Sequence, residues 1–417
     1  MMPLKHCASP KRPRAQPNYH RRMSTATRIP GRRFLHSPGP TPLPEAVLHA
    51  MSVQPMDLAD PRVDANIAAC EHGLKRLLRT EAADVFLYAA NGHGVWEAVI
   101  ENLAAPGQTV LVPGTGHFSE SWAVQAEGLG RSVVRTPWRE GWPIDAVAVA
   151  QALRDDKAHA IQAVLAVHTD TASAVTSDIA ALRRALDEAR HPALLVADVV
   201  ASLGAAPFAM DALGVDVAVG ASQKGLMCPP GVGFVAVNEK AFAHSVRNTA
   251  PRFYWDWVRR RDALSYRKFC GTPPQNALFG LEAALGLIFT EGLDAVFARH
   301  ALLAGAVHAA VEGWREGGAI DFQARDPASR SVSVTCIAVT DGVDVDALRT
   351  IARERMQVAI AGGLGPLMGR AFRIGHLGDC NPAMILGALA GTEAALRVLG
   401  VPLGDGVTRA VQWLARD

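Results

Sequence analysis

Short apolar runs alternate with amphipathic stretches along most of the chain. Residues 109–112, 163–167 and 215–219 carry nearly uninterrupted Val, Leu and Ala, which is typical of strands buried on both faces of a sheet. Residues 178–190 place apolar side chains at helical spacing instead. This alternation predicts an α/β fold whose mostly parallel sheet is covered by helices on both faces.

The rest of the chain predicts helices over residues 276–316 and then a smaller α+β part. At 417 residues the chain is long enough for two domains. We therefore expect a large domain at residues 46–290 and a small one at residues 291–417. The strands and helices expected in the small domain are residues 332–339, 343–354, 371–374 and 382–398.

The first 45 residues differ from both domains. Residues 1–33 are rich in Arg, Lys and Pro and contain no acidic residue. Three interpretations stay open: a disordered basic tail, a start site assigned too early with Met23 as the true start, and an organellar presequence. The prolines of residues 34–45 exclude a helix or central strand and predict an extended arm. This arm is either a linker or a backbone clamp over a site, with Gly39 allowing close approach.

Charge and composition exclude several classes of protein. A net charge of +2 argues against nucleic acid as the main partner. Apolar runs fall short of the roughly 20 residues that cross a bilayer, so no membrane partner is expected. The six cysteines form no Cys-x-x-Cys pair, so we expect neither a disulfide framework nor a zinc site. A reducing cytoplasm fits this cysteine usage.

Polar groups follow four of the predicted strands, at the ends where parallel sheets bind ligands. They are the glycine turn at residues 91–94, residues 168–171, Asp198 and residues 222–224. A glycine turn between strand and helix aims backbone N–H groups and a helix dipole at an anion. Chance explains one or two such coincidences, whereas four together favour a site.

Lys224 is the most informative residue of this set. It stands between the strand at 215–219 and the breaker at 229–231, and lysines are rarely buried without a task. Desolvation would lower the pKa of its amine and make the amine nucleophilic. An isolated lysine would otherwise be interpreted as a surface loop residue.

Other candidates keep two interpretations each. Asp198 either caps a local loop or pairs with a protonated ring nitrogen. Phe118 either packs in the core or stacks on a ring, and His168 alone is interpreted as structural. Arg373, inside an apolar strand, binds either a structural carboxylate or a ligand carboxylate. Cys336 is expected to be a buried thiol.

Three stretches carry a resemblance to a known family: residues 37–42, 220–231 and 362–379. They resemble the class V aminotransferases, fold type I of the pyridoxal phosphate enzymes. Within this family the chain is most similar to the serine–glyoxylate and alanine–glyoxylate aminotransferase group. The chain differs from the family pattern at Asn91, Asp170, Ala174 and Ala201.

The resemblance implies pyridoxal 5'-phosphate as cofactor and a role for each matching residue. Lys224 would form a Schiff base with the cofactor, and Asp198 would keep its ring nitrogen protonated, so that the ring acts as an electron sink. Phe118 would cover the ring, and Thr171 would bond its phenolic oxygen. The residues implied around the cofactor phosphate are Asn91, Gly92, His93 and Gln223, with Thr272 from the second subunit of a homodimer. The residues implied at the substrate are Arg373 for its α-carboxylate and Gly39 and Pro40 of the arm.

The implied activity is transfer of an amino group from a small amino acid, serine first, to glyoxylate, giving glycine and a 2-keto acid (hydroxypyruvate). Alanine–glyoxylate, serine–pyruvate and aspartate–glyoxylate transamination are the alternatives. Two further hypotheses keep the cofactor: a lyase or desulfurase, and a binding protein without turnover. A desulfurase needs a reactive cysteine, which the expected burial of Cys336 disfavours.

Overall fold

The computed structural model describes residues 31–261 and 264–416. Phe34–Asp417 form one compact unit. Residues 1–30 of the basic extension, Met23 included, lie outside the described residues. Among the described helices, none is long and apolar enough to cross a membrane.

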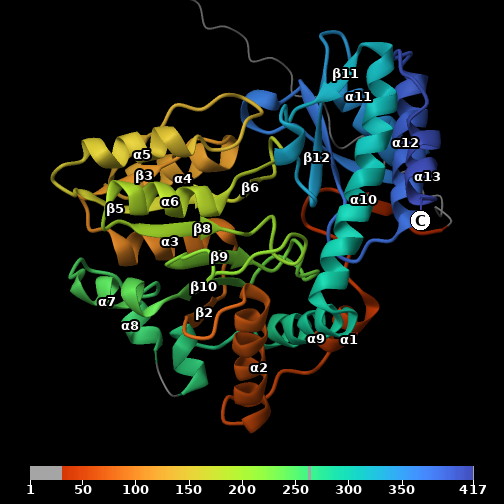
Figure 1. The fold of residues 1–417 in the computed structure, drawn as a ribbon. Coiled ribbons are helices and arrows are strands. Elements are labelled where there is room, and N and C mark those ends of the chain that lie inside the picture. Colours follow the sequence, from red (N-terminus) through yellow and green to blue (C-terminus); the bar gives the residue numbers. More distant parts are fainter. Residues whose placement is uncertain (1–30, 262–263, 417) are drawn as a thin grey trace, which may run out of the picture. The chain divides into compact units, whose positions relative to one another are not determined.

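The larger sheet has seven strands in the order β2-β10-β9-β8-β5-β3-β4 (Figure 1). Neighbours from β9 through β4 pair in parallel, and β10 runs antiparallel to both β2 and β9. The predicted α/β fold with a mostly parallel sheet is thus confirmed. In sheet order the strands are Asp84–Tyr88, Gly233–Val237, Val217–Ala221, Leu194–Asp198, Ile161–Val167, Thr109–Val112 and Ser132–Arg135.

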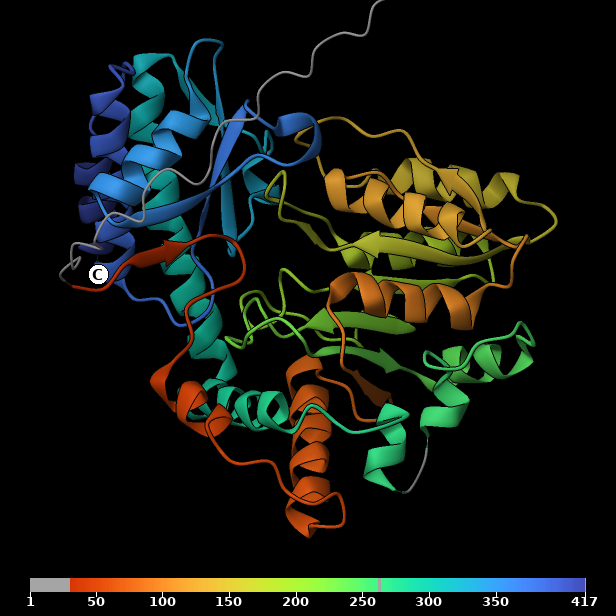
Figure 2. The ribbon, with the colours of Figure 1, turned by 180° about the vertical axis from the view of Figure 1, so that it is seen from behind.

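Helices cover both faces of this sheet (Figures 1 and 2). In β5, Val164 and Ala166 join one apolar core while Leu165 and Val167 join the other, as the two-residue period of a strand requires. The first core includes α2 (Pro61–Leu78), α5 (Ala146–Asp155) and α6 (Ile179–Ala189). The second includes α3 (Gly92–Leu103), α4 (His117–Gly128) and α7 (Glu239–Arg247).

A smaller sheet has five strands in the order β1-β13-β14-β12-β11. These strands are Phe34–His36, Val358–Gly362, Ala371–Gly375, Val334–Val339 and Ile320–Phe322. A third apolar core lies between this sheet and four helices, α10 (Leu293–Trp314), α11 (Val345–Arg355), α12 (Pro382–Val398) and α13 (Gly406–Leu414). The domain boundary expected near residue 290 stays a prediction.

Two strands of the smaller sheet were not predicted from the sequence. Residues 361 and 362 lie outside the strands expected in the small domain, but they end β13, because Ala361 pairs with Arg373 and Gly362 with Phe372 on β14. The arm begins with an edge strand, β1, which pairs in parallel with β13. The proline-rich segment after it is irregular until α1 begins.

The remaining elements are short or connect the two sheets. The helix α9 packs against α1 and α2, and the hairpin β6–β7 follows β5 directly. These elements are α1 (Glu45–Met51), β6 (Thr169–Asp170), β7 (Val175–Thr176), α8 (Trp257–Arg260), α9 (Gln275–Glu291) and the 3-10 turns Ser265–Phe269, Arg315–Gly317, Pro327–Ser329 and Gly365–Leu367.

Histidines gather where β1, β14 and α10 meet. His36, His300 and His376 are fully buried, and His36 Nδ1 lies 2.9 Å from the Gly375 carbonyl oxygen. The half-buried His308 ring meets that of His376 edge to face, with centroids 6.3 Å apart. Burial lowers the pKa of each imidazole, to about 4 for His300 and His308.

These histidines predict loss of stability in mild acid. Their pKa is lower in the folded than in the unfolded chain, so below about pH 6.5 the unfolded chain binds more protons and stability falls with pH. Urea unfolding between pH 7.5 and 4.5 should show this fall. His308→Phe should flatten it by up to about 1.4 kcal/mol per pH unit. An unchanged slope in that variant would contradict the assignment.

Candidate active site

A cavity of about 160 Å³ opens at the carboxyl ends of β5, β8 and β9. It brings together most of the residues that the sequence predicted as a site. Those that line it are Asn91, Gly92, His93, Phe118, Thr171, Asp198, Gln223 and Lys224. Thr169, from the predicted segment 168–171, also lines it, and the lining residues that the sequence did not predict are Trp96, Val167, Val200 and Ala201.

Lys224 enters the cavity from the turn that follows β9. Burial, the largest cause, lowers the pKa of its amine to about 8; the nearby Arg373 charge acts in the same direction, and the Asp198 charge opposes both. An amine with this pKa is partly neutral near pH 8, so it can act as a base or nucleophile.

The N-terminal arm touches this lysine directly. The Lys224 amine donates a hydrogen bond to the Pro38 carbonyl oxygen at 2.5 Å, and Thr41 Oγ1 donates to the Lys224 carbonyl at 3.1 Å. Gly39 has φ +132°, and a Cβ there would lie 2.5 Å from Lys224 Nζ. Only glycine fits this position. Pro40, the other arm residue predicted at the site, is exposed.

Asp198 ends β8, and each of its carboxylate oxygens accepts one hydrogen bond. The Val200 N–H donates to Oδ1 at 2.7 Å, and the indole N–H of Trp96 donates to Oδ2 at 3.0 Å. Burial raises the pKa of Asp198 to about 6, while these two bonds and the Lys224 charge act against that rise. The carboxylate therefore stays largely ionised at neutral pH.

The N-terminus of α3 forms another wall of the cavity. Asn91 is the N-cap, and its side chain accepts a hydrogen bond from the Gly94 N–H at 3.1 Å. The first N–H groups of a helix have no partner within the helix, so those of Gly92 and His93 remain for a ligand. With the helix dipole, they make a site suited to a phosphate group.

Two further lining residues have polar or aromatic groups available to a ligand. The side-chain oxygen of Gln223 is buried and has no hydrogen-bond partner among the residues that the structure describes. Because amide O and N positions are interchangeable, this amide can serve as a donor. The Phe118 N–H donates to Asp170 Oδ2 at 2.8 Å, which fixes the start of α4 and with it the Phe118 ring at the cavity wall.

Arg373 lies on β14, next to the cavity, and is buried. Its Nε donates to the Gly362 carbonyl at 2.7 Å and its Nη1 to the Thr171 carbonyl at 2.9 Å. Within residues 31–261 and 264–416 no carboxylate forms an ion pair with it. A structural carboxylate partner is thus not found there, and burial lowers the pKa of its guanidinium.

Three other sequence candidates lie elsewhere. Thr272 is exposed in this chain and does not line the cavity; its predicted place in a partner's site stays a prediction. His168 is buried and bonds Ser202 Oγ at 2.8 Å, as expected of a structural histidine. Cys336 is buried in β12, and burial raises the pKa of its thiol to about 12, which makes it unreactive.

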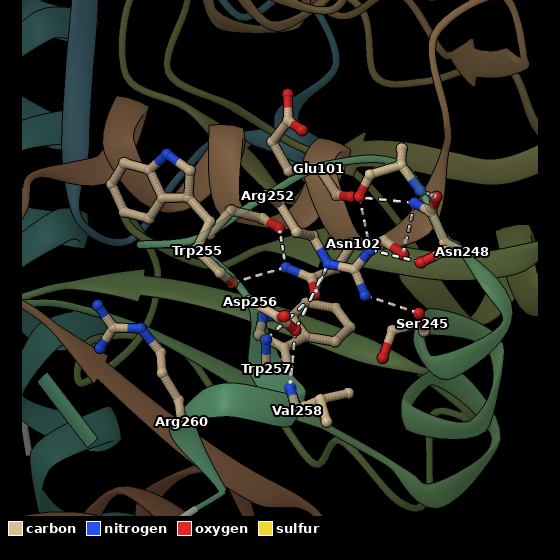
Figure 3. Close-up of polar contacts among 12 residues, drawn as sticks. Glu101, Asn102, Ser245, Asn248, Arg252, Trp255, Asp256, Trp257, Val258 and Arg260 are labelled. Carbon is tan, nitrogen blue, oxygen red and sulfur yellow. Dashed lines mark hydrogen bonds and ion pairs between the residues drawn. The ribbon is translucent and has the colours of Figure 1, made fainter. Parts of the chain in front are cut away.

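The far end of α3 is held by a polar network (Figure 3). The buried Asn102 donates to the Trp255 carbonyl at 2.7 Å, and its side-chain oxygen accepts from Arg252 Nε at 3.1 Å. The Arg252 guanidinium also donates to the carbonyls of Asn248 and Ser245. The aromatic segment after α7 therefore fixes the helix whose first turn forms the cavity wall.

Trp96 is the lining residue that most clearly escaped the sequence prediction. The apolar residues that follow the glycine turn at residues 91–94 have helical spacing, and at this spacing Trp96 is interpreted as an apolar core residue. It follows Gly92 by four positions, however, and residues i and i+4 share one face of a helix. A polar-tipped aromatic on the face of the glycine turn is the signal that could have placed it in the site.

Pyridoxal 5'-phosphate fits the groups that meet in this cavity. A partly neutral lysine amine, a buried carboxylate and a helix N-terminus match an aldehyde, a ring nitrogen and a phosphate. The orphaned amide of Gln223 adds a further polar group beside the helix end.

Comparisons with known proteins agree with this fit. A family model for class-V aminotransferases matches residues 33–368. The chain is 39% identical over 399 residues to a serine–glyoxylate aminotransferase of Methylorubrum extorquens, covering 94% of this chain and 98% of the relative. It is 41% identical over 377 residues to an L-aspartate–glyoxylate aminotransferase of Paracoccus denitrificans, covering 89% and 94%.

A solved structure supports the same family. The ureidoglycine–glyoxylate aminotransferase of Bacillus subtilis superposes with a TM-score of 0.85 at 25% identity, covering 93% of this chain and 99% of its own. The resemblance noted in the sequence is thereby confirmed. The chain belongs to the class-V aminotransferase family and is a pyridoxal phosphate-dependent transaminase of fold type I.

Proposed function

We propose that the protein transfers the amino group of L-serine to glyoxylate, giving hydroxypyruvate and glycine. The observation that carries this proposal is the buried Lys224 amine facing Asp198 in one cavity. Glyoxylate is the acceptor in the names of all three relatives described above. Serine is the donor in the first of these names.

Lys224 carries the proton in this proposal. Its lowered pKa leaves part of the amine neutral, so that it can remove the Cα proton of the donor and return a proton later. Asp198 keeps its charge and would hold a proton on the ring nitrogen of the cofactor. When bound, pyridoxal phosphate supplies an electron sink for the charge left at Cα.

The remaining lining residues hold the cofactor. The N–H groups of Gly92 and His93, beside the Asn91 cap, would bind its phosphate together with Gln223. Phe118 would cover the ring and the Thr171 hydroxyl would bond its phenolic oxygen. We further propose a homodimer in which Thr272 of one chain, exposed here, reaches the phosphate of the other.

Arg373 is proposed to bind the donor's α-carboxylate. A buried guanidinium without a carboxylate partner among the described residues favours an incoming anion. Its two bonds to backbone carbonyls fix the orientation of the fork, which suits bidentate recognition. The arm at Gly39 would close over the donor amino acid.

Aspartate is the second candidate donor, because the relative named for aspartate is 41% identical. An aspartate side chain brings a second carboxylate, which calls for a second cation. The described residues that line the cavity include no arginine, and His93 is their one cationic candidate besides Lys224. Thr169 offers a hydroxyl instead, which suits the neutral serine side chain.

A spectrum of the purified protein tests the donor. Bound pyridoxal phosphate absorbs visible light, and accepting an amino group removes that band. L-serine, L-alanine and L-aspartate are each added without a keto acid, and we expect serine to bleach the band fastest. Faster bleaching by aspartate would show that aspartate is the preferred donor, and the proposed transamination would still hold. A protein that is colourless as purified and takes up no added pyridoxal phosphate would refute the proposal.

Removal of the lysine amine should abolish turnover. Lys224→Ala should lower kcat with serine and glyoxylate by at least about 10³-fold, because the variant lacks the group that moves the proton. Lys157→Ala, which changes an exposed lysine, serves as the control and should keep the wild-type rate. Full turnover by Lys224→Ala would disprove the role of Lys224.

The carboxylate role of Arg373 predicts a change in KM. Arg373→Lys keeps the charge but loses the fork, so KM for serine should rise roughly 10- to 100-fold with a smaller change in kcat. Arg370→Lys alters an exposed arginine just before the same strand and should leave KM unchanged. Equal KM values for all three proteins would exclude Arg373 from donor binding.

A further inference from the structure

The indole of Trp96 is held in place beside Asp198. Its side chain is buried, and its ring stacks on that of Trp122 with centroids 5.0 Å apart and planes 12° apart. On another side the His93 ring lies 4.6 Å away. Its N–H points to Asp198 Oδ2 at 3.0 Å. The indole cannot swing away without disturbing this stack.

Both hydrogen bonds to the Asp198 carboxylate come from groups that can only donate. The Trp96 indole N–H meets one oxygen and the Val200 backbone N–H meets the other. A protonated carboxyl would present an O–H to one of these donors and lose that bond. The arrangement thus favours the ionised carboxylate over the neutral acid.

Charged groups around Asp198 do not settle its ionisation by themselves. Lys224 favours the ionised form, and Asp170, also fully buried, opposes it. Of the other groups, Arg373 acts on Lys224, and His93 lines the same cavity from α3. Burial works against the charge most strongly. Neutral donors are therefore needed to balance it.

We propose that Trp96 is a positioning residue that holds Asp198 ionised and oriented toward the cofactor ring. The inference rests on the proposed role of Asp198 toward pyridoxal phosphate. An indole suits this task because it adds one N–H donor and no acceptor beside the carboxylate. Trp96 itself acts through the carboxylate.

The test compares pyridoxal phosphate affinity against pH in the wild-type protein and in Trp96→Phe. Phenylalanine keeps an aromatic ring and removes the N–H, so Asp198 should take up a proton at higher pH. The midpoint of the acidic loss of affinity, followed by absorbance titration of cofactor-free protein, should rise by about one pH unit. Affinity at a fixed pH near that midpoint should fall several-fold.

Trp122→Phe is the matched control. Trp122 belongs to the same stack, but its indole N–H is buried without a hydrogen-bond partner among the described residues. The pH midpoint at which Trp122→Phe loses affinity for pyridoxal phosphate should stay at the wild-type value. The inference fails if Trp96→Phe has the wild-type midpoint, or if Trp122→Phe shifts it equally.

If the Trp96→Phe variant does not fold, a second measurement tests the inference on the wild-type protein. Wild-type protein labelled with 15N-tryptophan has eight indole N–H groups, and the signal of Trp96 should titrate with Asp198. Asp198→Asn should abolish that titration, and the absence of a titrating signal would overturn the inference. The NMR titration uses cofactor-free protein, so its result does not depend on cofactor binding. Failure of the wild-type protein to bind pyridoxal phosphate would refute the proposed function, whereas the absence of a titrating Trp96 signal would refute this inference alone.

Discussion

The rest of the structure depends on two opposite charges, those of Lys224 and Asp198, that are held in one cavity. Asp198 ends β8 and Lys224 follows the neighbouring parallel strand β9, and the ladder pairs Asp198 with Val219. Sheet register therefore decides how far apart they lie. Burial pushes each toward its neutral form, and the surrounding donors and charges keep the pair useful as acid, base and counter-ion.

The helix α3 supplies what the sheet cannot. Its first turn presents N–H groups and its second presents the Trp96 indole, so in the proposed function one rigid element would serve both ends of the cofactor. Asn102 and Arg252 hold its other end through a segment of little regular structure. A rigid helix fixed at its far end places groups more precisely than a loop would.

Much of this arrangement could be predicted from the sequence. Residues at the ends of buried apolar strands could be assigned to one edge of a parallel sheet, which is how Lys224 and Asp198 were found. Trp96 was missed because its partner is 102 residues away and its helical spacing equally fits a core residue. β1 and β13 were missed because both strands are short and their pairing with each other joins distant segments.

The hydrogen-bond partners of Arg373 could not be predicted from the sequence, for a different reason. Arg373 was correctly placed in a strand, but only the fold shows that its bonds go to the Gly362 and Thr171 carbonyls. Its pairing partner Ala361 was not expected in a strand, because the glycines that follow it weaken the strand pattern. Local sequence does not encode which distant backbone will supply a partner.

The arm that touches Lys224 has a consequence for synthesis of the chain. His36, in the edge strand that anchors the arm, bonds Gly375, which lies 339 residues later. At roughly 5 to 20 residues per second, the ribosome needs on the order of 20 to 70 s to make that partner after His36. The strands of the large sheet, the last of which is β10 at Gly233–Val237, are all made within this interval, whereas the His36 bond to Gly375 must wait until the interval ends. The arm over the lysine is therefore anchored only after the large sheet has been synthesised.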